Sequence, residues 1–83
     1  MNKILVEVFV PVLNRQFDIF IPLQPPMYQV LDLMKKAVTE LSGGRFSANE
    51  GTVLCYREEG TILNINLSVY ELGLRNGSKL MLI

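Results

Sequence analysis

Residues 25–44 constrain the fold more than any other part of the chain, because only this stretch has the apolar spacing of a helix. Apolar side chains that recur every three or four positions gather on one side of a helix, and here they are Met27, Val30, Leu31, Met34, Ala37, Val38 and Leu41. Pro26 is tolerated in the first turn, and Gly43 or Gly44 can adopt the left-handed conformation that ends a helix. One face of this helix must therefore pack against another element.

The composition predicts one small globular domain that covers residues 1–83. Apolar residues make up 49% of the chain and charged residues 19%, a balance typical of a folded rather than a disordered protein. Eight basic and eight acidic residues cancel, so we expect no basic surface for nucleic acid. No apolar run reaches the roughly 20 residues that span a bilayer, so we expect no membrane insertion. A single cysteine fits a reducing compartment, and we expect the cytoplasm.

The rest of the chain predicts strands. Residues 3–10 and 16–21 alternate between apolar and other side chains, and Pro22 ends the second segment, so we expect a first hairpin. Residues 52–56 and 61–65 flank a short connection that contains Gly60, which predicts a second hairpin. Residues 78–83 form the closing strand after an Asn-Gly turn.

This order of elements predicts an α+β domain in which one helix packs on one face of a mixed sheet of four to five strands. A right-handed crossover through the helix region would set the last strand parallel to the first.

Two motifs carry a family resemblance. The segments LSVYELGL at 67–74 and NGSKLML at 76–82, with the element order, resemble the ubiquitin-like β-grasp fold. In that fold a Leu-Ser-x-Tyr turn and a closing strand of the form Gly-(Asp/Ser)-x-Leu-x-Leu recur in these places. The length, the proline-rich approach to the helix and the apolar C-terminus resemble the bacterial YukD/EsaB family, which is associated with type VII (WXG100) secretion. The resemblance implies a non-conjugated accessory or regulatory protein that binds a component of that machinery in the cytoplasm.

The sequence departs from ubiquitin and the sulfur carriers at the C-terminus. Those proteins extend a flexible tail that ends in Gly-Gly, whereas this sequence ends in LMLI at 80–83, and Gly43-Gly44 is internal. We therefore expect no conjugation. Two alternatives stay open: a modifier or sulfur carrier without its tail, or a β-grasp adaptor domain, such as a Ras-binding-like or PB1-like module, taken from a larger protein.

The sequence offers little for catalysis. It contains no histidine and only one cysteine, so neither a Ser/His/Asp arrangement nor a metal site can be assembled in the usual way. Glu58 and Glu59 are neighbours on a turn, where their side chains point apart, and no GxxxxGK[ST] phosphate loop is present. Tyr70 is expected to hold its turn through its hydroxyl group. We predict a protein that is not an enzyme and uses no cofactor or metal.

A surface for protein binding is the remaining prediction. Strand alternation sends a second apolar set to the face of the sheet opposite the core; the set is Leu5, Phe9, Phe20, Val53, Cys55, Met81 and Ile83. We expect Leu5, Val53, Met81 and Ile83 to form one contiguous patch, as the resemblance to the hydrophobic patch of ubiquitin also implies. The alternative is that edge residues fold under loops and the rest is ordinary exposure.

The partner that we expect at this patch is a protein component of a type VII secretion machinery, and a homodimer is a further option. Tyr28 and Leu33 flank the helix stripe and offer a smaller second contact.

Overall fold

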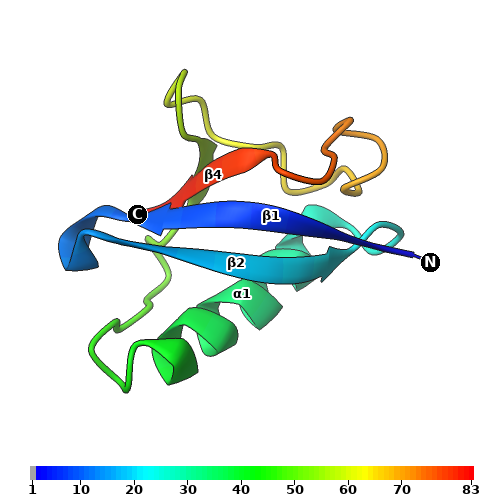
Figure 1. The fold of residues 1–83 in the computed structure, drawn as a ribbon. Coiled ribbons are helices and arrows are strands. Elements are labelled where there is room, and N and C mark those ends of the chain that lie inside the picture. The colour runs from blue at the N-terminus through cyan, green and yellow to red at the C-terminus, as the bar shows by residue number, and fades with distance from the viewer. Residues whose placement is uncertain (1) are drawn as a thin grey trace.

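The computed structural model describes residues 2–83 and contains four strands and one α-helix. In chain order the elements are β1 (Lys3–Val10), the 3-10 helix η1 (Pro11–Leu13), β2 (Arg15–Pro22), α1 (Met27–Leu41), β3 (Leu54–Tyr56) and β4 (Lys79–Leu82) (Figure 1). The predicted α+β class is confirmed.

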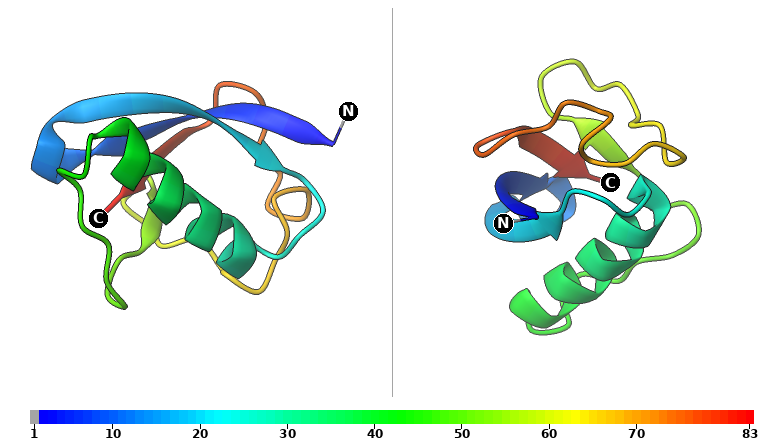
Figure 2. Two further views of the ribbon diagram at one scale, coloured as in Figure 1. Left: turned by 90° about the horizontal axis from the view of Figure 1, so that it is seen from below. Right: turned by 90° about the vertical axis from the view of Figure 1, so that its right-hand side faces the viewer.

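The four strands form one mixed sheet in the order β2-β1-β4-β3. β1 pairs antiparallel with β2 and parallel with β4, and β3 pairs antiparallel with β4. The helix α1 crosses one face of the sheet, as both views of Figure 2 show. The parallel pairing of the first and last strands is therefore confirmed.

The helix α1 begins after Pro26, whose extended backbone occupies the N-cap. Five residues of its predicted apolar stripe are buried, namely Met27, Val30, Leu31, Met34 and Val38. Ala37 is half-buried, whereas Leu41 in the last turn is 54% exposed, so the prediction that Leu41 belongs to the buried face is wrong. Gly43 and Gly44 follow with φ angles of 67° and 82°, and their N–H groups donate to the carbonyl oxygens of Glu40 and Thr39 at 3.0 and 2.8 Å. The two glycines thus satisfy carbonyl groups that the end of a helix leaves free.

The core lies between α1 and the sheet, and loop residues complete it. Buried side chains from all four strands and from α1 belong to one hydrophobic core cluster. Four further buried residues come from segments outside the strands and the helix, and the sequence patterns did not identify them: Phe46, Leu63, Val69 and Leu74. Phe46 is fixed by its own N–H, which donates to the Oγ of Ser42 at 3.0 Å.

The predicted second hairpin is shorter than expected. Thr61 accepts a hydrogen bond from the Tyr56 N–H at 2.9 Å, and the Leu63 N–H donates to Leu54 at 3.0 Å. Only Ile62 forms a bridge, with Cys55, so the prediction of a full strand over residues 61–65 is wrong. The chain leaves β3 after Leu63 because the following residues pack at the start of α1, where the Ile65 carbonyl accepts a bond from Tyr28 at 2.9 Å.

The turn at residues 67–74 is held by a reciprocal pair of hydrogen bonds. The Ser68 N–H donates to the Oε1 of Glu71 at 2.9 Å, and the Glu71 N–H donates to the Oγ of Ser68 at 3.0 Å. This is the arrangement of a capping box. Tyr70 contributes its backbone N–H, which donates to Leu23 at 3.1 Å, while its side chain is exposed. The prediction that the Tyr70 hydroxyl holds the turn is therefore wrong.

Candidate functional site

The face of the sheet opposite α1 is the candidate site. Paired residues on neighbouring strands point to the same side of a sheet, and the register sets Phe9, Met81 and Cys55 side by side on β1, β4 and β3. Val53 and Ile83 extend this arrangement, because their backbones exchange hydrogen bonds of 2.7 and 3.0 Å. We call four residues the β3–β4 group: Met81 of β4, its neighbour Phe9 of β1, and Val53 and Ile83, which directly adjoin β3 and β4.

Leu5 and Phe20, which we call the β1–β2 pair, lie opposite each other on the same face but in a different place. A charged row separates the pair from the β3–β4 group: Asp18, Glu7 and Lys79 stand next to one another on β2, β1 and β4. The predicted single contiguous patch is therefore wrong. Alternation along a strand fixes the face that a side chain takes, whereas the register between strands decides which side chains are neighbours.

Exposure of the apolar side chains is greatest at two ends of this face. Phe20 is 65% exposed and Ile83 is 51% exposed. Leu5, Phe9 and the remaining members of the β3–β4 group are half-buried. These residues can all be reached by a partner chain, and their role in binding stays a prediction.

Cys55 is not accessible. Its residue is 1% exposed, because β4 flanks it on one side, where it pairs with Met81, and the Ile62 bridge closes the other side of β3. The expectation that Cys55 belongs to an exposed surface is wrong. A thiol in this position cannot contact a docking partner, so we leave Cys55 out of the candidate surface.

Arg57 covers part of the face, although the sequence pattern places it in a hairpin connection and does not identify it as a site residue. Its guanidinium group lies 4.3 Å from the ring centroid of Phe9, and its Nη1 donates to the Oε1 of Gln16 at 3.0 Å. The side chain thus starts beyond β3 and reaches β2. Position 57 continues the alternation that places Val53 and Cys55 on this face, and this continuation was the available signal.

Replacing Arg57 with alanine is expected to lower the free energy of unfolding by about 0.5–1 kcal/mol, the usual size of a cation–π contact at an exposed site. Urea denaturation measures this loss. Arg57→Lys is the matched control. Lysine keeps the charge, but it lacks the planar group that stacks on Phe9 and donates to Gln16 at the same time. Equal stability of wild type and Arg57→Ala would show that the stacked arrangement is not populated in solution.

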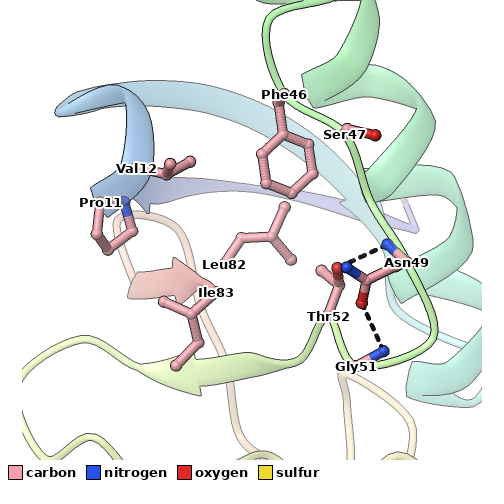
Figure 3. A pocket seen from close by; sticks show the side chains of 9 residues that line it. All are labelled: Pro11, Val12, Phe46, Ser47, Asn49, Gly51, Thr52, Leu82 and Ile83. Atoms are coloured by element: carbon pink, nitrogen blue, oxygen red, sulfur yellow. Dashed lines mark hydrogen bonds between the residues drawn. The ribbon is translucent and has the colours of Figure 1, made fainter.

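An apolar pocket of about 410 Å³ lies at one end of the sheet (Figure 3). Pro11, Val12 and Phe46 line one part of it, and Leu82 and Ile83 line another. The adjoining loop is held by short bonds: the Asn49 N–H donates to the Thr52 Oγ1 at 3.0 Å, and the Gly51 N–H donates to the Asn49 Oδ1 at 2.7 Å (Figure 3). The polar side chains among the lining residues are those of Ser47, Asn49 and Thr52, and no Asp, Glu, Lys, Arg, His or Cys is among them.

Within residues 2–83, no three His, Cys, Asp or Glu side chains come together in a way that could hold a metal ion. In the same range no helix is long and apolar enough to cross a bilayer.

No protein-family model matches the sequence, and no curated protein matches it. Solved structures do resemble it. The ubiquitin-like domain of the type VII secretion protein EccD1 of Mycobacterium tuberculosis superposes with a TM-score of 0.80 at 21% identity, covering 100% of this chain and 99% of that one. A chain of the MycP5-free ESX-5 inner membrane complex gives a TM-score of 0.72 at 18% identity, where the match covers 100% of this chain but 21% of that one.

A third similar structure comes from a different class of protein. A chain of the toluene 4-monooxygenase HD complex with 4-bromobenzoate gives a TM-score of 0.75 at 15% identity, covering 96% of this chain and 95% of that one. All three identities are low enough that the likeness concerns the fold. The chain therefore has a ubiquitin-like fold that matches domains of type VII secretion proteins, and the same fold also serves other systems.

Proposed function

We propose that this chain is a non-conjugated ubiquitin-like accessory protein of a bacterial type VII secretion system. It acts in the cytoplasm by binding a protein component of that machinery, and it performs no catalysis. The observation that carries this proposal is the superposition on the EccD1 ubiquitin-like domain, which covers nearly the whole of both chains at a TM-score of 0.80. A similar chain in an ESX-5 inner membrane complex supports the same system.

The β3–β4 group is the surface that we assign to this binding. Met81 lies on β4, and Val53 and Ile83 directly adjoin the paired strands β3 and β4. Val53 and Ile83 exchange backbone hydrogen bonds, so the three residues stand together on the face away from α1. Apolar side chains at the centre of an interface contribute most of the binding energy. Ile83 is the most exposed member of the group, and Met81 lies next to the Phe9 ring that Arg57 covers.

Changing Val53 and Met81 together to serine is expected to block export of a WXG100 substrate while the domain stays folded. Neither side chain belongs to the core, so the thermal transition should stay cooperative with only a modest loss of stability. The measurement is substrate secretion in the native host after the chromosomal gene is deleted and replaced by the variant, with a thermal melt of the purified protein alongside.

The matched control is Tyr28→Ser with Leu33→Ser, which removes two exposed apolar side chains from α1 instead. This variant should secrete normally. If the Val53/Met81 variant exported normally and the α1 variant did not, the binding surface would have to lie on the helix. Normal export in a strain that lacks the gene altogether would overturn the proposed function itself.

A further inference from the structure

The strand β2 forms one edge of the sheet, since among the described residues 2–83 its only neighbour in the strand order is β1. Its eight residues lie along the outside of the sheet in Figure 1. Backbone groups on the outer side of an edge strand are free to pair with another chain.

The register with β1 decides which residues of β2 direct their N–H and C=O groups outward. Antiparallel residue pairs alternate between those that exchange hydrogen bonds and those that do not. The Leu23 N–H donates to Asn2 at 2.8 Å, so the bonded pairs continue from there at every second position, through Ile21, Ile19 and Phe17. Gln16, Asp18 and Phe20 belong to the other pairs, and their backbone groups must point away from β1.

Two observations support this assignment. On β1, the partners of these residues bond in the opposite direction, toward β4: the Leu5 N–H donates to the Asn76 Oδ1 at 2.8 Å, and the Glu7 N–H donates to Ser78 at 2.9 Å. On β2, the next outward position is Pro22, which has no N–H to leave free. Within residues 2–83, no backbone hydrogen bond from another loop or turn reaches the outward groups of β2.

The side chains at this edge carry unbalanced charge. Asp18 and Glu7 face each other as a non-bonded pair, the kind in which side chains come closest, and like charges in that position repel. Lys79 lies on the far side of Glu7, which leaves Asp18 beside the open edge. A basic side chain on an added strand, opposite Asp18, would relieve this repulsion.

The neighbouring position is apolar. Phe20 is two residues from Asp18 on the same face and largely exposed. A shallow pocket of about 360 Å³ lies over this area, and its lining residues are Leu5, Glu7, Asp18, Phe20, Asn76 and Gly77. The edge thus presents the open backbone groups of Gln16, Asp18 and Phe20. The acidic side chain of Asp18 and the apolar side chain of Phe20 lie on the same face, at the two-residue spacing of a strand.

We propose that the outer edge of β2 binds an extended segment of another protein, which adds to the sheet as an antiparallel strand. The segment places a lysine or arginine opposite Asp18 and an apolar residue two positions away, beside Phe20. A second copy of this chain fits less well, because the symmetric pairing that uses all three outward residues sets Asp18 against Asp18 of the other copy. This site is separate from the β3–β4 group and does not depend on the proposed function.

The probe is the peptide acetyl-Thr-Val-Thr-Lys-Thr-Val-Thr-amide, titrated into the 15N-labelled protein and followed by amide chemical shifts. Shifts should centre on β2, and replacing the peptide lysine with glutamate should weaken binding about tenfold, as a charge-assisted contact implies. Asp18→Asn should weaken binding of the lysine peptide by a similar factor. Asp18→Lys should reverse the preference and favour the glutamate peptide. These substitutions change an exposed side chain, so the fold should be kept.

A second pair of peptides tests the backbone without altering the protein. In an antiparallel strand opposite Asp18, the lysine N–H faces β2 and the N–H of the adjacent threonine faces solvent. Methylation of the backbone nitrogen of the lysine should therefore abolish the shifts on β2. Methylation of the backbone nitrogen of the adjacent threonine should leave these shifts unchanged. Equal binding of both methylated peptides, equal binding of the lysine and glutamate peptides, or shifts centred outside β2 would overturn the proposal. A concentration-dependent dimer joined through β2 would also overturn it, since the edge would then belong to a second copy.

Discussion

Replacing Met34 with aspartate is expected to unfold the domain. Met34 lies in the middle of the apolar stripe of α1 and is 1% exposed. A carboxylate in that position would have no partner in the apolar core, and burying an unpaired charge costs several kcal/mol. A chain of 83 residues has a total stability of roughly 4–12 kcal/mol. Far-ultraviolet circular dichroism should show loss of the native spectrum at 25 °C.

Leu33→Asp provides the matched control for this experiment. Leu33 is the preceding residue of the same helix but is 55% exposed, so its carboxylate would stay in water. The control should melt cooperatively at nearly the wild-type temperature, because both variants carry the same change in helix propensity and charge. If Met34→Asp also melted like the wild type, the packing of α1 against the sheet would have to be reassigned.

The second large effect is expected at Phe46, in the loop between α1 and β3. Phe46 is 5% exposed and belongs to the core cluster. Phe46→Ala should lower the free energy of unfolding by about 3–5 kcal/mol, because the lost ring leaves a cavity that the loop can fill only in part. Urea denaturation monitored by circular dichroism measures the change.

Two variants at this loop separate packing from local backbone effects. Ser47→Ala changes the next residue, which is exposed, and should alter stability by less than about 0.5 kcal/mol. Phe46→Leu keeps most of the apolar volume and should recover a large part of the loss caused by alanine. A loss below about 1 kcal/mol for Phe46→Ala would mean that the loop does not pack on the core in solution.

The helix and the long strands could be predicted from the sequence because their patterns are local. The apolar stripe from Met27 to Leu41 and the alternation from Lys3 to Val10 coincide with α1 and β1. Phe46 was missed for the opposite reason. A single aromatic residue in an irregular loop has no period, and only the tertiary structure shows that it closes the core beside Ser42.

The arrangement of the residues in the candidate site could be predicted in part. Strand alternation indicates on which face of the sheet each side chain lies, but the lateral order of the side chains on that face depends on register. The charged row through Glu7, the burial of Cys55 between β4 and the Ile62 bridge, and the reach of Arg57 across the sheet all follow from strand pairing between distant segments. A pattern within one strand carries no information on these pairings.

The central place of β4 in the sheet also has a consequence for folding kinetics. β4 is the last element in sequence, yet it separates β1 from β3 in the strand order. Leu5 and Asn76, which are 71 residues apart, are joined by a hydrogen bond where the chain enters β4. Closing a loop of this length costs chain entropy before β4 gains its contacts on either side. The β1–β2 hairpin can form early from local contacts, but joining β3 to it must wait for this long-range closure, which we expect to set the folding rate.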